Sequence, residues 1–161
     1  MLEVHYIPSK AVMKPLDRIS LSMLLAWTLL GSAHASEAVI GYVKSVSGEA
    51  YVVANGRAEP ARIGSPVSQG HLLRTGKNGS LGVTFKDNTV MSFGPDTELS
   101  LDEYLYAPSQ GQLKFGSTLS RGTLNYVSGV IAKLKPEAVK VRTPTGTIGV
   151  RGTQFLAKVA P

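Results

Sequence analysis

The sequence predicts an all-β fold, either a single compact β-sandwich or a short β-solenoid-like roll of many short strands. Apolar and polar residues alternate with a period of two in several segments after residue 36, as in strands that bury one face. Glycine, asparagine and proline interrupt these segments at intervals too short for helices of ordinary length. The chain has 161 residues, 43% hydrophobic and 17% charged, which is the balance of a folded protein, and one domain is expected over residues 37–159.

The first strands are predicted at residues 39–46 and 50–53, with Ser47 and Gly48 between them. Asn55 and Gly56 follow directly. This dipeptide readily adopts the left-handed backbone that a type I′ turn requires, so a hairpin is expected there.

A second hairpin is predicted over residues 81–93. Apolar residues alternate through 81–85, Asp87 and Asn88 turn the chain, and residues 89–93 again place alternate side chains on one face. Further along, only residues 128–138 indicate a helical turn. No exact repeat is visible, which disfavours a long, regular solenoid.

Residues 1–35 are predicted to be a cleavable signal peptide. Lys14 and Arg18 precede an apolar run at 19–30, and the small-residue triplet at 33–35 predicts cleavage after Ala35. The run is shorter than the roughly 20 apolar residues that span a bilayer. A buried core helix is the alternative, but no later helix is expected to pack against it. The charge pattern favours Met13 as the start of translation.

We therefore expect the mature protein in the periplasm or secreted beyond it, without a stable membrane anchor. The chain has no cysteine, which excludes disulfides, thiolate metal sites, cysteine nucleophiles and a lipidated cysteine.

Positive charge is concentrated at the C-terminal end. From residue 121 onward Glu137 is the only acid, and the basic residues are Arg121, Lys133, Lys135, Lys140, Arg142, Arg151 and Lys158. Such a field attracts anionic glycans, lipid headgroups or an acidic protein surface. A nucleic-acid partner is not expected, because the cations do not cluster with stacking aromatics. A solvated basic face that keeps the protein soluble is the structural alternative.

The residues for catalysis are missing. His71 is the only histidine after the predicted leader, and no second histidine or elbow motif completes a zinc site or a Ser-His-Asp triad. Asp102 and Glu103 are adjacent and should point to opposite faces of a strand, so they would not form a converging carboxylate pair. We predict no catalytic residue, no metal and no cofactor.

The segment 141–155 combines basic residues, a proline and three glycines. In a functional interpretation, Lys140, Arg142 and Arg151 share a surface that binds an anionic partner. In an architectural interpretation, the glycines allow a positive φ or a close approach of strands, and the proline suits a sheet edge. The residues to which the second interpretation assigns a structural role are Thr143, Pro144, Gly149, Gly152, Thr153 and Phe155.

This segment resembles the closing motif of the FecR domain, which ends in Thr-Pro, Arg-Gly-Thr and an aromatic residue. The resemblance extends over residues 40–159. Residues 41–52 are similar to the family's opening strand pair, with Gly48 at the turn, and residues 64–76, 81–93 and 113–126 are similar to its later blocks.

The resemblance implies a periplasmic regulatory module. The best understood relatives also carry a cytoplasmic segment that restrains a sigma factor, and a membrane helix. Residues 1–35 are too short for both, so transcriptional control is not transferred to this chain.

Two functions are left open. The first is a non-catalytic signalling or scaffolding domain that binds an envelope or membrane protein, for example by adding a strand to the partner's sheet. The second is a module that binds an envelope glycan or another polyanion through the basic C-terminal region. An enzyme is a third, less favoured class. The sequence does not predict an oligomeric state.

Overall fold

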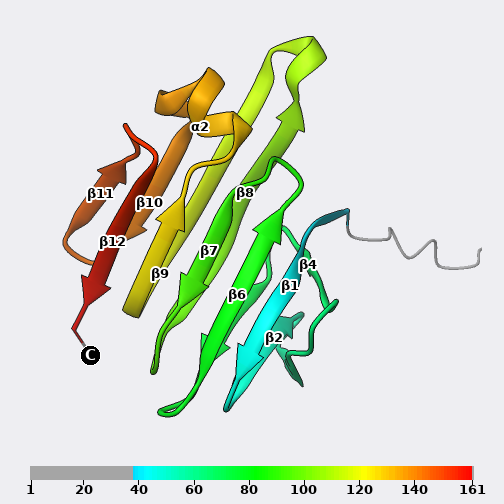
Figure 1. Cartoon of the computed structure of the whole chain (residues 1–161), viewed down its shortest axis with the longest axis vertical. Helices are drawn as coiled ribbons and strands as arrows, with labels where there is room; N and C mark the ends of the chain where they lie inside the picture. Colours follow the sequence, from blue (N-terminus) through cyan, green and yellow to red (C-terminus); the bar gives the residue numbers. More distant parts are fainter. Residues whose placement is uncertain (1–37, 161) are drawn as a thin grey trace, which may run out of the picture. The chain divides into compact units, whose positions relative to one another are not determined.

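The structure, a computed structural model, describes residues 38–160, so the predicted signal peptide lies outside the described residues. Most of the chain is β-structure, which confirms the predicted all-β class (Figure 1). The many short strands form a curled, mainly antiparallel sheet with the form of a half-barrel. The elements are β1 (Val39–Ser47), β2 (Ala50–Ala54), β3 (Arg57–Pro60), β4 (Pro66–Ser68), β5 (Leu72–Thr75), β6 (Ser80–Phe85), β7 (Val90–Phe93), β8 (Glu98–Ala107), η3 (Pro108–Gln110), β9 (Gln112–Val127), α2 (Val130–Leu134), η4 (Pro136–Ala138), β10 (Val139–Thr143), β11 (Gly146–Gly149) and β12 (Gln154–Val159).

The long strand β9 belongs to both halves of the curled sheet. Its first part pairs with β8 on one side and β10 on the other. Its last six residues pair with β7 and β12. The β8 half therefore runs β3-β2-β5-β8-β9-β10-β11, and the β7 half runs β4-β1-β6-β7-β9-β12. The pairing of β9 with β10 is parallel.

Gly122 lies where β9 passes from one half to the other. Its φ is +89°, a backbone conformation that residues with a Cβ rarely adopt. A Cβ at this position would overlap Thr97, whose backbone and side chain lie directly against the glycine. The Thr97 hydroxyl accepts a hydrogen bond from the Thr123 N–H at 3.0 Å and lies 2.9 Å from the Gly94 carbonyl oxygen. The crossing is therefore fixed by close backbone contact and hydrogen bonds.

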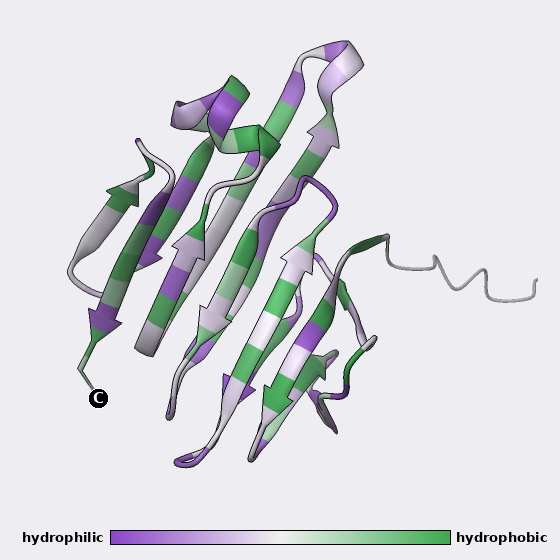
Figure 2. Ribbon diagram, in the orientation of Figure 1, coloured by the Kyte–Doolittle hydropathy of each residue, from purple (hydrophilic) through white to green (hydrophobic). Residues whose placement is uncertain are grey.

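One apolar core lies between the two halves. Figure 2 shows apolar and polar residues alternating along the strands, and the inward set includes Leu73 and Leu99 from the β8 half and Val83 and Met91 from the β7 half. Aromatic rings continue the core toward β12 in a chain of contacts between neighbouring rings, which are Tyr104, Phe85, Phe115, Tyr126 and Phe155.

Both predicted hairpin turns are confirmed. Asn55 and Gly56 have φ values of 50° and 76° and join β2 to β3, and β6 pairs with β7 across the Asp87-Asn88 turn. The expected pairing of the first two strands is wrong. β1 pairs with β4 and β6, whereas β2 pairs with β3 and β5, because Gly48 passes the chain from one half of the sheet to the other.

The predicted helical turn is also confirmed, as α2 and η4. Pro136 starts η4 directly after α2 and Lys135, so the helix has five residues. Within residues 38–160, no helix has the length and apolar character needed to cross a membrane.

Substituting Gly122 should destabilise the whole fold. We expect Gly122→Ala to lower the free energy of unfolding by at least about 2 kcal/mol, since it adds backbone strain to a clash with Thr97. The matched control is Gly149→Ala on β11, where a Cβ would meet nothing within 4 Å and the cost should stay within about 0.5 kcal/mol. Urea unfolding followed by circular dichroism measures both, and equal stabilities would contradict the role given to Gly122.

Candidate functional site

The outer face of the β8 half carries most of the ion pairs in the described chain. Arg121 on β9 pairs with Glu98 on β8 at 3.4 Å, and Arg74 on β5 lies over the ring of Tyr51 at 5.6 Å. Tyr51, Arg74 and Glu98 alternate with the buried residues of their strands, so they point away from the core. Arg121 thus lies beside an acid and Arg74 beside an aromatic ring, so their charges are partly compensated.

The prediction that Asp102 and Glu103 point to opposite faces is wrong. The register of β8 against β9 shifts between Leu101 and Glu103, which inserts an extra residue and forms a β-bulge. Asp102 accepts a hydrogen bond from Thr118 at 2.6 Å, and Glu103 lies 3.0 Å from the ammonium of Lys114. Both carboxylates thus lie on the outer face, and each is held by a β9 side chain.

The three predicted anion-binding residues do not gather at one place. Lys140 and Arg142 project from the same face of β10 and line one shallow groove of about 340 Å³. Arg142 also pairs with Asp102 at 3.4 Å, and Glu103 and Glu137 line the same groove. Arg151 lies instead in the loop between β11 and β12 and lines a separate depression of about 100 Å³. The structure therefore brings Lys140 and Arg142 together and leaves Arg151 apart, and anion binding by these residues remains a prediction.

His71 is held in the turn between β4 and β5. It is buried, and its Nδ1 accepts a hydrogen bond from the backbone N–H of Ser68 at 3.2 Å. Across the described part of the chain, no three His, Asp or Glu side chains gather in a way that could hold a metal ion.

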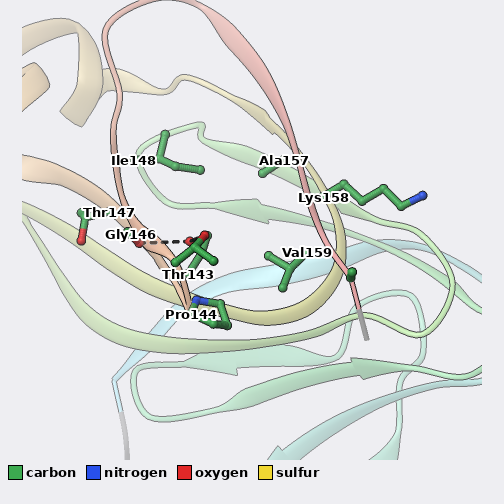
Figure 3. A pocket seen from close by; sticks show the side chains of 10 residues that line it. Thr143, Pro144, Gly146, Thr147, Ile148, Ala157, Lys158 and Val159 are labelled. Carbon is green, nitrogen blue, oxygen red and sulfur yellow. Dashed lines mark hydrogen bonds between the residues drawn. The ribbon is translucent and has the colours of Figure 1, made fainter.

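The segment 141–155 forms the hairpin β10–β11 and the start of β12. Pro144 and Thr145 make its two-residue turn, and the Thr143 hydroxyl donates a hydrogen bond to the Gly146 carbonyl at 3.1 Å. The hairpin and β12 border a cavity of about 550 Å³. Figure 3 shows Ile148 and Ala157 on opposite sides of this cavity, with the Lys158 ammonium extending away from it.

The end of the same segment attaches β12 to β9. Ser128 donates two hydrogen bonds, from its hydroxyl to the Gly152 carbonyl at 2.6 Å and from its N–H to the Thr153 carbonyl at 2.8 Å. Phe155 stacks on Tyr126, with ring centroids 5.0 Å apart. The backbone of Gly152 and Thr153 and the ring of Phe155 therefore hold the start of β12 against β9.

Two of the three glycines in the segment do not have the geometry expected of them. Gly146 and Gly149 have no left-handed backbone, and a Cβ at either one would meet nothing within 4 Å. Only Gly152 has a positive φ, of +147°. In β11, only Ile148 is partly buried, and the other three residues are exposed.

A comparison with protein-family models matches residues 71–161 to the family described as FecR protein. The match covers more than half of the chain. The chain belongs to the FecR family. The family is regulatory rather than catalytic, which indicates a regulatory or signalling domain. No curated protein and no solved structure matches the chain.

The matched FecR segment begins at His71 and contains β5 to β12. The four strands before it belong to the same sheet, since β2 pairs with β5 and β1 pairs with β6. The sheet therefore extends beyond the matched segment toward the N-terminus.

Four strands of this FecR domain have a single paired neighbour among the described residues: β3, β4, β11 and β12. β3 carries Arg57, Glu59 and Pro60 on its exposed edge, and β4 has three residues and begins with Pro66. Charges, proline and short length are the usual means of preventing a sheet edge from pairing with another strand. β11 and β12 contain no proline, and their only charged residue is Lys158. The edges open to pairing therefore lie at the closing motif.

Inside the domain, the buried carboxylate of Asp87 joins three elements. It accepts hydrogen bonds from the Thr89 hydroxyl at 2.7 Å, from the Tyr104 hydroxyl at 3.2 Å and from the Ile131 N–H at 3.3 Å. Burial, followed by the charge of Asp87, raises the pKa of Tyr104 well above its usual range. Burial also raises the pKa of Tyr126 to about 12, and the nearby Thr89 hydroxyl partly opposes this rise. Both phenols are therefore neutral at physiological pH.

Removing the Tyr104 hydroxyl should weaken this cluster. In Tyr104→Phe the buried Asp87 N–H loses its acceptor, which lies at 3.0 Å, and the carboxylate loses a donor. We expect a loss of about 1–3 kcal/mol in the free energy of unfolding. Tyr106→Phe, two residues along the same strand, is the control and should change it by less than about 0.5 kcal/mol. Thermal and urea unfolding measure the difference, and a Tyr104→Phe protein as stable as the control would refute the assignment.

Proposed function

We propose that this FecR domain is a non-catalytic binding module of the bacterial envelope that relays a signal or assembles a complex through protein–protein contacts. The observation that supports it most directly is the pair of unprotected strand edges, β11 and β12, at the family's closing motif. An open edge binds an extended segment through main-chain hydrogen bonds and needs no catalytic residue. Regulation by binding also agrees with a family that is regulatory.

The electrostatics of the outer face favour this proposal over a polyanion-binding module. A polyanion requires free cations that it can neutralise together. Here Lys114, Arg121 and Arg142 each lie within 3.4 Å of a carboxylate oxygen. A polyanion that binds this face would either displace those carboxylates or be repelled by them.

The proposed location of the protein depends on its predicted signal peptide. We propose that residues 1–35 direct export, that cleavage follows Ala35, and that the domain acts in the periplasm. Mass spectrometry of the protein from a periplasmic extract should find Ser36 at the N-terminus. An intact leader on protein from the cytosol would overturn the localisation.

Salt dependence separates the two kinds of partner. Immobilised protein should retain the same defined envelope protein at about 0.05 M and about 0.5 M salt, because main-chain pairing is little screened whereas exposed charge contacts are. The control is Lys140→Ala with Arg142→Ala, which should leave retention unchanged. Retention on an anionic polysaccharide that falls steeply with salt and with this double change would support the polyanion alternative and overturn the proposal. Turnover that depends on His71 would overturn its non-catalytic part.

A further inference from the structure

The two halves of the sheet end at different distances from β9. In the β8 half, β10 and β11 follow β9, whereas in the β7 half only β12 does. Among the described residues, the β7 half is therefore one strand shorter than the half it packs against. The strand that would follow β12 would cover the side of β11 that borders the cavity, where Ile148 is half-buried.

Two hollows separate β12 from the β10–β11 hairpin. The cavity of about 550 Å³ borders β12 from Ala157 onward, and the smaller depression borders its first residues, Gln154 and Phe155. Ile148 on β11 lines both. The two hollows thus border both ends of β12, with the β10–β11 hairpin on their other side.

The free edge of β12 carries backbone groups directed outward. Ser128 and Thr153 form a hydrogen-bonded pair of β9 and the start of β12. Because such pairs alternate in an antiparallel ladder, Phe155, Ala157 and Val159 bond to β9. The N–H and C=O groups of Gln154, Leu156 and Lys158 therefore point away from β9, and Leu156 exposes 75% of its surface there.

The charge around this space defines the segment that fits it. The residues lining the two hollows include two cations, Lys158 and Arg151, and no acid. On the outer face, Lys158 would be the cross-strand neighbour of a residue in the added strand. An acidic residue is favoured opposite it, and apolar residues are favoured on the inner face over Ile148.

We propose that an extended, acidic segment of a partner protein completes the β7 half by pairing with β12 and covering β11. This inference rests on the proposed function and names the site at which the protein partner binds. The segment is about six residues long, to match Gln154–Val159, and alternates apolar residues facing Ile148 with polar residues that include an acid beside Lys158. The assignment also gives Arg151 a place at the binding site that is separate from Lys140 and Arg142.

Hydrogen exchange of the unaltered protein tests the open edge first. Without partner, the amides of Leu156 and Lys158 should exchange at least ten-fold faster than those of Phe155 and Ala157, which bond to β9. Partner captured in the salt experiment should slow Leu156 and Lys158 and leave the amides of β3 unchanged. Slow exchange of Leu156 and Lys158 without partner, or no change with it, would overturn the site.

Two variants test the backbone pairing and the charge. Leu156→Pro removes an outward N–H without touching a bond to β9 and should abolish capture, whereas Leu156→Thr keeps the N–H and should retain it. Lys158→Glu with Arg151→Glu should weaken capture about ten-fold, and Lys44→Glu at an exposed position of β1 should not. Circular dichroism verifies that each variant is folded. If the unaltered protein captures a partner and both Leu156→Pro and the charge reversal still capture it, this site is overturned while the proposed function stands. If the unaltered protein captures no partner, both are overturned.

Discussion

The passage of β9 from one half of the sheet to the other is the constraint on which the rest of the structure depends. At Gly122 the backbone takes a conformation that a side chain would strain, and it lies against Thr97 so closely that a Cβ would not fit. A straight β9 would keep the same neighbours throughout and give a flat sheet. Because it turns, its two parts have different neighbours, and the inward faces of the halves meet over one core.

The same crossing explains why the C-terminal side of the domain is open. In each half of the sheet, β9 has one edge left to pair with the strands that follow it in the chain. The β10–β11 hairpin pairs with this edge in one half, and β12 pairs with it in the other. Three strands cannot extend two halves equally. Phe155 stacks on Tyr126 and holds β12 in place on β9. The other edge of β12 therefore has no paired strand among the described residues.

Local features of this structure could be predicted from the sequence, and long-range ones could not. Asn55-Gly56 and the Asp87-Asn88 turn need only their own backbone preferences, so both hairpins were predictable. The pairing of β1 with β6 instead of β2 depends on segments more than thirty residues apart. The bulge at Asp102 could not be predicted from the sequence, since the residues around it are of the types found in a regular strand. The alternation rule therefore assigned Glu103 to the wrong face.

The candidate site shows the same division. β11 lies within the segment 141–155 that the sequence singled out, whereas Leu156 and Lys158 of β12 lie just beyond it. The reason for the site also differs from both interpretations offered for that segment. Gly146 and Gly149 meet no close neighbour, and Lys140 and Arg142 lie among carboxylates. The distinguishing property is the absence of the devices that protect β3 and β4, which becomes visible only when it is known which strands end the sheet. If the domain acts by contact as proposed, an edge that is held on one side and unpaired on the other would bind a strand with little reorganisation, since its backbone is already extended.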